Sequence, residues 1–398
     1  RSQVISASGR IKDQWQDEGL WNWLEMEGKG IRPSVGLGRW VSYREDGIEG
    51  YPDINVHLFP NSYSSAKKLP PEARRIINFL QRFLPEFPLE DLDLFQSPST
   101  TIFQKRISTI DDNRIGVVEI ERVTSPTVGR GGEIRDGDSS RAQREMAVQI
   151  AGQYWGQMIP SMTQRDLWIS RVLSESYALF YLRTAISKEV YEERIQELRK
   201  QILDPVEYDF RWKRADALRR NYSLTGGTQF SDIPTMVTTN YGVYVLSEML
   251  RLRIGNQAFF ASLEDIAQGN VVTTQMLQQS FEKHSSAELK DFFDFWIHSG
   301  FIPSIDIALH NSKEGMLGCI TSDIPFGVFE VPLRIFIGTK KEPKGIRDAF
   351  ITMNQGQGQF FIAQQEVENI QIEVDPLGLS LIRNATIKKK NPKNSCIE

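Results

Sequence analysis

The sequence is short of the residues that metal and disulfide chemistry require. Its 398 residues include only two cysteines and four histidines. Two cysteines cannot build a disulfide framework or a zinc–thiolate site by themselves. We expect Cys319 and Cys396 to be free thiols, because Cys396 lies in a polar tail.

Strong charge and long hydrophobic runs are also missing. The formal net charge is −4 and the sequence pI is about 5.8, so there is no electrostatic case for binding nucleic acid. The basic run Lys388-Lys389-Lys390 is typical of a solvated terminus. No apolar run reaches the roughly 18 residues of a membrane-spanning helix. The chain opens at Arg1 without an initiator Met or a signal peptide, so we expect a processed product or a fragment of a longer protein. Nothing indicates its compartment.

The residues that are present are those of an ordinary globular protein. Hydrophobic residues make up 40% and charged residues 25%, and the length favours two or three domains. Helical spacing of apolar residues begins at Leu69 and dominates from Ser140 to Gly300, where alternation typical of strands replaces it. Further strands are predicted at 38–60, 93–95 and 115–120, and a Gly-, Ser- and Asp-rich loop at 124–140.

Several short motifs follow one another in a characteristic order. They are a helix over 72–84, Gln153-Tyr154-Trp155-Gly156, Asp166-Leu167-Trp168, an aromatic segment at 292–296 before Gly300, and Val374-Asp375-Pro376-Leu377-Gly378. This order resembles the aminopeptidase N family of gluzincin zinc peptidases, whose H-Q-W-F-G and D-L-W-L motifs are similar to the second and third. The resemblance covers about residues 40–385.

The resemblance implies an α+β fold in which a thermolysin-like (gluzincin) catalytic-type domain precedes a small β-sandwich. It assigns residues 1–60 to a polar segment and the last strands of an N-terminal β-domain. Residues 61–300 would form the peptidase-type domain, 301–386 the β-sandwich and 387–398 a basic tail. The regularly spaced short strands after Gly300 also favour the sandwich by themselves.

The positions of the family's zinc ligands hold other residues. In H-E-x-x-H, two imidazoles at i and i+4 and a downstream Glu hold zinc, and the first Glu acts as the general base. Alignment on Gln153 puts Val148 and Gly152 at the histidines, Gln149 at the base and Arg171 at the third ligand. Val and Gly have no ligating side chain, Gln cannot take a proton, and Arg is a permanent cation. We therefore predict no metal and no cofactor.

Shifting the alignment by one residue does not restore a zinc site. The pair becomes Gln149 and Gln153, with Val172 third, and amides are poor zinc ligands beside imidazole and carboxylate. The four histidines, at positions 57, 284, 298 and 310, all lie far from this segment in sequence. The prediction of a degenerate site therefore holds in both alignments.

Two other features of the family are missing. Its substrate-amine motif G-x-M-E-N is expected near 108–118, where Asp111 and Asn113 are candidate remnants. Its transition-state Tyr is expected at Thr239. Tyr241 lies nearby in sequence, but each residue of displacement along a helix rotates the side chain by about 100°.

Arg171 would put a fixed positive charge where the zinc dication would lie. A buried Arg needs a carboxylate partner, and Glu175 and Glu145 are the candidates by helical spacing. The simplest expectation is an Arg171 that packs its stem and reaches water. The sharper hypothesis is that a guanidinium–carboxylate pair of Arg171 replaces the metal between the two helices.

These observations favour a catalytically inactive, aminopeptidase-like domain that acts as a scaffold or a protein- or peptide-interaction module. A protein or peptide partner is expected, and the chain would be the soluble part of a membrane-associated or multi-subunit assembly. The alternative is a hydrolase of this family with relocated chemistry, built from Glu145, Glu175, Asp111 and Tyr241 around the old cleft.

Overall fold

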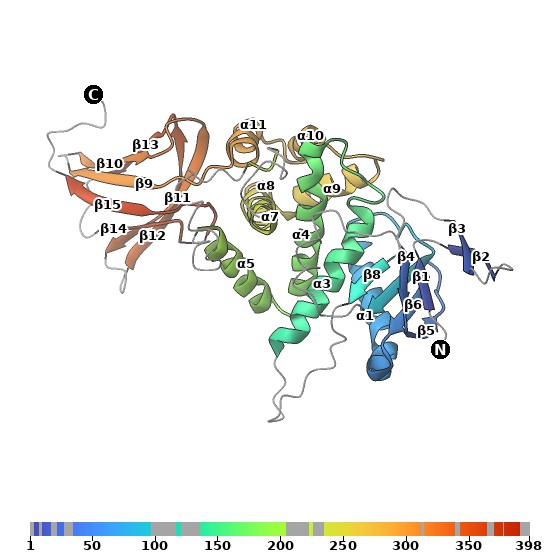
Figure 1. Cartoon of the computed structure of the whole chain (residues 1–398). Coiled ribbons are helices and arrows are strands. Elements are labelled where there is room, and N and C mark those ends of the chain that lie inside the picture. The colour runs from blue at the N-terminus through green and yellow to red at the C-terminus, as the bar shows by residue number, and fades with distance from the viewer. Residues whose placement is uncertain are drawn as a thin grey trace, which may run out of the picture. The chain divides into compact units, whose positions relative to one another are not determined.

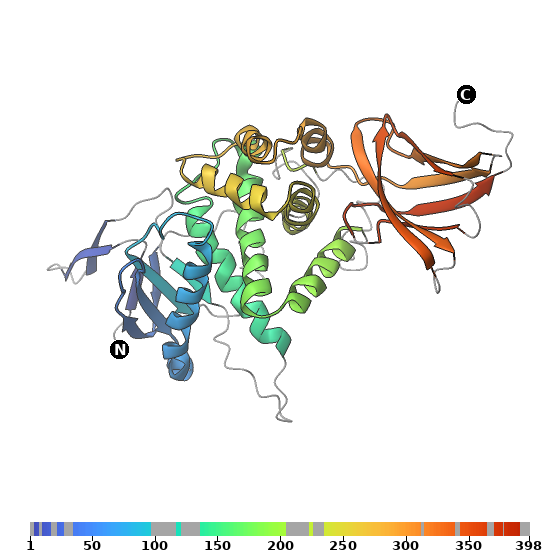
Figure 2. The same cartoon turned by 180° about the vertical axis from the view of Figure 1, so that it is seen from behind.

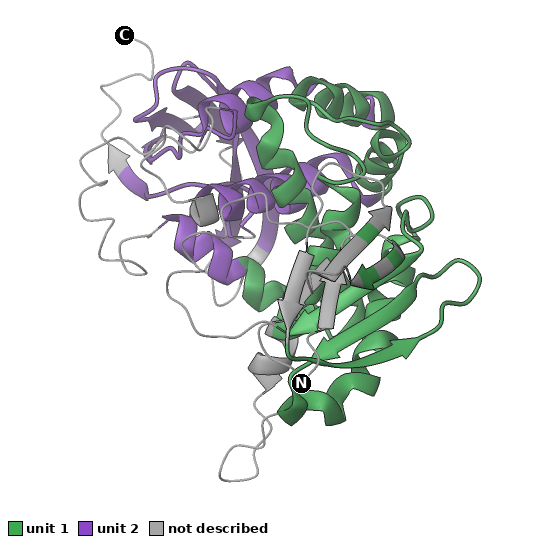
Figure 3. Cartoon of the chain, turned by 45° about the vertical axis from the view of Figure 1, so that its right-hand side comes forward, with its two compact units in different colours: residues 1–195, 257–284 green, residues 196–256, 285–398 purple. Residues whose placement is uncertain are grey.

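The structure is a computed structural model of the chain that describes residues 4–7, 10–16, 22–27, 35–96, 117–120, 136–203, 223–225, 235–311, 314–338, 343–363, 370–376 and 378–390. The chain divides into two compact units (Figure 3), of which unit 1 is residues 1–195 with 257–284 and unit 2 is residues 196–256 with 285–398. Both helices and sheets are present, so the predicted α+β class is confirmed. No helix of the described part is long and apolar enough to cross a membrane.

Unit 1 contains a four-stranded sheet of mixed direction. Its strands, in spatial order, are β5 (Val41–Glu45), β6 (Asp53–Leu58), β7 (Asp91–Gln96) and β8 (Val117–Ile120). β5 is antiparallel to β6, whereas β6, β7 and β8 run parallel. Side chains alternate between two faces along a strand, and Ile54, Val56 and Leu58 on one face of β6 are fully buried. Asn55 and His57 therefore lie on the opposite face.

Two strands before residue 60 belong to the same sheet as two strands after it. β5 and β6 are hydrogen-bonded into one sheet with β7 and β8. The parallel pairing of β6 with β7 joins the two stretches. Two short antiparallel pairs precede this sheet. They are β1 (Val4–Ala7) with β4 (Val35–Gly38) and β2 (Arg10–Gln16) with β3 (Asn22–Glu27).

The helices of unit 1 cover one face of the sheet and each other. They are η1 (Pro60–Lys68), α1 (Leu69–Leu80), α3 (Asp136–Tyr154), η2 (Gln164–Asp166), α4 (Leu167–Ala185), the start of α5 (Lys188–Leu203), α9 (Asn256–Ala267) and α10 (Thr274–Ser285). α1 contacts β6 and α3 contacts β8, and α4 packs beside α3 (Figures 1 and 2). α4 is buried over most of its length, as expected of a helix that is apolar on nearly all sides.

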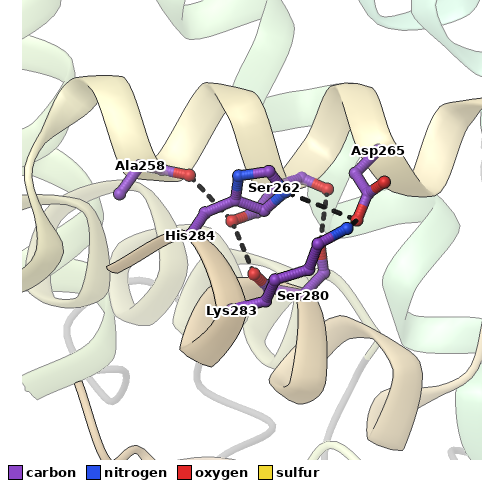
Figure 4. Close-up of polar contacts among 6 residues, drawn as sticks. All are labelled: Ala258, Ser262, Asp265, Ser280, Lys283 and His284. Carbon is purple, nitrogen blue, oxygen red and sulfur yellow. Dashed lines mark hydrogen bonds and ion pairs between the residues drawn. The ribbon is translucent and has the colours of Figure 1, made fainter. Parts of the chain in front are cut away.

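The hairpin of α9 and α10 is joined by small residues and one acidic side chain (Figure 4). The Ser262 and Ser280 hydroxyls each donate to the other's backbone carbonyl at 3.0 Å. Asp265 on α9 accepts from Lys283 on α10 at 2.9 Å, and His284 lies 3.4 Å from the same carboxylate. Serine side chains are short enough to let the two backbones approach and still satisfy their own hydroxyls.

The helices of unit 2 include two π-helical segments. They are the end of α5, α7 (Thr235–Tyr244) continued by the π-helix η4 (Val245–Leu250) and α8 (Arg251–Ile254), and α11 (Lys290–Phe292) continued by the π-helix η5 (Phe293–Ser299). Gly255 caps α8 at a φ of 84°. Gly300 caps η5 at a φ of 66°. Positive φ is accessible to glycine at little steric cost.

The strands of unit 2 form one seven-stranded sheet. They are β9 (Ile305–Asn311), β10 (Gly315–Ser322), β11 (Val328–Gly338), β12 (Pro343–Asn354), β13 (Gln357–Ala363), β14 (Ile370–Val374) and β15 (Ala385–Lys390), in the order β14-β11-β12-β13-β10-β9-β15. β12 and β13 are paired only at Asn354 and Gln357 beside their turn. The sheet therefore parts there into a group of three strands and a group of four (Figure 1).

Two features near the end of the chain can be compared with the sequence analysis. The basic run 388–390 belongs to β15, which pairs in parallel with β9 at one end of the sheet order, and Lys388 is exposed there. Cys319 is disulfide-bonded in the structure, so the expectation that it is a free thiol is wrong.

Asp375 fixes the turn that follows β14. Its carboxylate accepts from the Arg199 guanidinium of α5 at 2.9 Å and from the backbone amides of Leu379 and Ser380 at 2.6 and 3.2 Å. The hydroxyl of Tyr244 donates to the carbonyl of Gly378 in the same turn. Asp375 is only 6% exposed. Burial, which disfavours the charged form more than Arg199 and the amides favour it, raises the pKa of Asp375 to about 6.

This shift predicts a stability that falls as pH rises. An acid whose folded pKa lies above its unfolded value binds more protons in the folded state, so its contribution is complete below about pH 4 and is lost as pH rises through about 6. We expect the wild-type free energy of unfolding, measured by urea denaturation, to lose about 1–3 kcal/mol over this window. Asp375→Asn, which keeps an acceptor for the two amides, should remove this component.

Asp348→Asn is the matched control. Asp348 is exposed and receives two hydrogen bonds from Arg334 at 2.7 and 2.8 Å, which lowers the pKa of its carboxyl. Its small contribution should have the opposite sign, being lost as pH falls. Identical pH profiles for the wild type and Asp375→Asn would contradict the role assigned to Asp375.

Candidate functional site

The candidate site lies on the helix pair α3 and α4 of unit 1. α3 carries Val148, Gln149 and Gly152, of which the first two are half-buried and Gly152 is buried. Val148 and Gly152 are four residues apart and therefore lie on one face of the helix. Arg171, half-buried, lies one turn before Glu175 on α4. The elements expected to carry the degenerate zinc positions are thus neighbouring helices.

A guanidinium–carboxylate pair joins the two helices. The Arg144 guanidinium on α3 donates to the Glu175 carboxylate on α4, and the two side chains are 20% and 28% exposed. Glu175 is a predicted carboxylate of this junction, Arg144 is not among the predicted residues, and the pairing of Arg171 stays a prediction. Arg144 could have been found from the sequence, because it lies one helical turn before Val148 on the same face. Glu145, the other predicted partner, is half-buried on α3.

The residues of this helix pair do not fit a zinc ion. Zinc in proteins is held by imidazole, thiolate or carboxylate groups, and the three aligned positions offer an aliphatic side chain, no side chain and a guanidinium cation. In the described part of the chain, no three His, Cys, Asp or Glu side chains lie close enough together to hold a metal ion. We therefore derive no chemical step through a metal.

The other predicted site residues lie outside the described part of the chain or in unit 2. Asp111 and Asn113 lie outside the described residues. Thr239 is half-buried on α7 of unit 2. Tyr241 on the same helix is fully buried and donates its hydroxyl to the backbone carbonyl of Trp296 at 2.7 Å. This hydrogen bond commits the Tyr241 hydroxyl to the core of unit 2, which argues against a role in relocated chemistry.

The motif Asp166-Leu167-Trp168 is a structural junction between α4 and α10. One carboxylate oxygen of Asp166 accepts from the backbone amide and the hydroxyl of Thr274, both at 2.8 Å, and the other accepts from Thr163 at 2.7 Å. The Trp168 indole donates to the same Thr274 hydroxyl at 3.1 Å. Asp166 therefore satisfies a free amide at the start of α10 while it anchors the start of α4.

The motif Gln153-Tyr154-Trp155-Gly156 also serves packing. Gln153 is fully buried and donates back to the Gln149 carbonyl at 3.1 Å. The Trp155 ring, equally buried, stacks on Tyr177 of α4 with centroids 6.2 Å apart. Gly156 follows the helix at a φ of 103°, and a Cβ there would lie 3.2 Å from the Ser170 Cβ. The residues that match the family motif are thus those that hold α3 against α4.

Comparison with known proteins supports the fold. No family model and no curated protein sequence matches the chain. Among solved structures, the chain is similar to Legionella pneumophila aminopeptidase A, determined in complex with aspartic acid, at 12% sequence identity and a TM-score of 0.67. The match covers 97% of this chain and 43% of that one, so the chain spans less than half the length of that structure. The chain therefore has an aminopeptidase-like fold.

We expect the stability of the protein to depend strongly on the hydrogen bonds that Asp166 accepts. Asp166→Ala would leave the buried Thr274 amide without its acceptor, and we expect the free energy of unfolding to fall by about 2–3 kcal/mol. Asp294→Ala is the control, because Asp294 is exposed and pairs with Lys290 four residues away on the surface. The control should cost about 0.5 kcal/mol or less in the same denaturation experiment. Equal losses in the two variants would show that Asp166 is not a junction.

The interhelical pair predicts a measurable coupling. In a double-mutant cycle of Arg144→Met and Glu175→Gln, we expect a coupling free energy of about 1 kcal/mol, because the pair is partly shielded from water. The same cycle on Lys188 and Glu192, an exposed pair within α5, should give about 0.3–0.5 kcal/mol. The pair would have no linking role if its coupling did not exceed that of the control.

Proposed function

We propose that the chain is a catalytically inactive member of the aminopeptidase N family. Its thermolysin-like domain and the β-sandwich that follows would act as a scaffold or a protein- or peptide-interaction module. The observation that carries this proposal is a contrast between two groups of residues on α3 and α4, the packing residues and those at the zinc-ligand positions. The packing residues of the family motifs are in place, whereas Val148, Gly152 and Arg171 stand where the zinc ligands would be.

The contrast has a physical basis in what each class of residue does. Trp155 and Gly156 determine how closely the helices pack, so a change at either would disturb the core. Zinc ligands serve the metal, and once it is dispensable their positions can take residues of other kinds. The Arg144–Glu175 pair supplies a direct link between the helices that needs no metal.

The edge strand β8 offers a surface for a partner that binds as an extended peptide. β8 ends the order β5-β6-β7-β8, so among the described strands one side of its backbone has no neighbour. An exposed strand edge can accept a further strand through main-chain hydrogen bonds without any catalytic group. The chain also spans only 43% of the aminopeptidase it resembles. We therefore infer that it works within a larger protein or assembly.

The test is metal content and turnover, with a restored site as positive control. After dialysis against zinc, the wild-type chain should hold well below one equivalent by mass-spectrometric metal analysis, and it should not cleave aminoacyl arylamides. The variant V148H/G152H/R171E should gain zinc if α3 and α4 present these positions as the alignment requires. Circular dichroism and a thermal melt establish whether that variant folds.

The outcomes separate the two parts of the proposal. Stoichiometric zinc in the wild type, or turnover lost on Gln149→Ala, would overturn the inactive assignment and favour the hydrolase with relocated residues. A folded triple variant that gains no zinc would overturn the alignment with the family. Zinc in the triple variant alone supports both.

A further inference from the structure

A polar group on the sheet of unit 1 is separate from the helix pair. Ser42 on β5 is exposed, and its Oγ lies 2.9 Å from Nδ1 of His57 on β6. Nε2 of His57 lies 3.7 Å from the Asp93 carboxylate on β7. No sequence motif relates the three residues, because they lie 15 and 36 positions apart along the chain (57 − 42 and 93 − 57).

The sheet register is what brings these residues together. Ser42 and His57 are cross-strand partners in the antiparallel β5–β6 ladder, so both side chains lie on one face. Asn55 and Asp93 are partners in the parallel β6–β7 ladder, which puts Asp93 diagonal to His57 on that face. The opposite face of β6 is the fully buried apolar core. A rigid, packed sheet therefore fixes the row serine, histidine and aspartate.

Surrounding contacts orient the histidine and the aspartate. His57 and Asp93 are 8% and 9% exposed. The Trp40 ring lies beside the imidazole, with ring centroids 6.1 Å apart, and the Asn55 amide donates to the second carboxylate oxygen at 2.9 Å. A proton on Nε2 would face the Asp93 anion, which leaves the Nδ1 lone pair directed at the Ser42 hydroxyl. This is the tautomer that a general base for serine needs.

We propose that Ser42 is a nucleophilic serine that accepts an acyl group from activated carboxylic esters, with His57 as its general base and Asp93 as a positioning residue. Ser42 Oγ bonds to the carbonyl carbon while its proton passes to His57 Nδ1. The bond from that carbon to the leaving oxygen then breaks, and the leaving alcohol or phenol takes the proton from Nδ1. In the second stage, water gives a proton to Nδ1 as its oxygen bonds to the carbonyl carbon. Ser42 Oγ leaves with that proton.

The oxyanion that develops in both stages requires hydrogen-bond donors. β5 ends the order of the described strands in this sheet, so alternate backbone amides on its outer side take no part in the β5–β6 ladder. These amides are the donors available beside an exposed serine on this strand. The reaction needs no metal and no residue of the α3–α4 pair, so it is independent of the proposed inactive peptidase site.

The experiment uses the full chain and a fluorophosphonate probe, with the labelled residue located by peptide mass spectrometry. Its phosphorus–fluorine bond breaks as Ser42 Oγ bonds to phosphorus, and the hydroxyl proton passes through His57 to solvent. We expect labelling at Ser42 that is lost in Ser42→Ala and kept in Ser64→Ala, a change at an exposed serine of η1. His57→Gln should slow labelling by about 100-fold, the low end of the range for a general base.

Two further measurements test the roles of the supporting residues. The wild-type labelling rate should rise with pH, because only an unprotonated imidazole can accept the serine proton. Asp93→Asn should slow labelling, whereas Asp93→Glu, which keeps a carboxylate at this position, should retain part of the rate. Labelling of Ser42 no faster than that of Ser64, or a rate independent of pH, would overturn the proposal. Since both readouts are made on the wild type, a His57 or Asp93 variant that misfolds would leave the test intact.

Discussion

The close packing of α3 on α4 is the constraint on which most of unit 1 depends. Trp155 at the end of α3 stacks on Tyr177 of α4, and Gly156 turns the chain where a larger residue would meet Ser170. Asp166 then starts α4 while it caps α10. These contacts lie within one short stretch of chain, yet they fix the relation of three helices. Because the interior is packed at crystal-like density, few other residues are tolerated at these positions.

The same helix pair is joined by a contact that involves no metal. In the zinc peptidases that the sequence resembles, the metal would lie between these helices. Here a guanidinium–carboxylate pair of Arg144 and Glu175 joins them directly, at a partly shielded site where the attraction is stronger than in open water. A protein of this construction needs no metal to keep the helices together. This agrees with the proposal that its role is binding rather than peptide hydrolysis.

The two faces of the unit 1 sheet carry different kinds of side chain. One face of β6 is wholly apolar and supports the helices, and its regularity holds the strands in register. The other face carries the row Ser42, His57 and Asp93, in which an exposed hydroxyl meets a nearly buried imidazole. Polar side chains are costly to bury without hydrogen-bond partners. The contacts that these residues make with one another therefore help to explain why His57 and Asp93 are tolerated with little exposure.

Local patterns in the sequence determined much of this protein. The change from helical spacing to alternation placed the boundary between helices and strands at Gly300, where the last helix ends, because side-chain periodicity is a local property of the chain. The sequence alone also shows that Val148 and Gly152 cannot ligate a metal, since neither has a ligating side chain wherever it lies. Only the tertiary structure decided that Arg144 meets Glu175, and that β6 joins β7 in one sheet. It alone brought Ser42, His57 and Asp93 together, because strand register links residues that no spacing along the chain can relate.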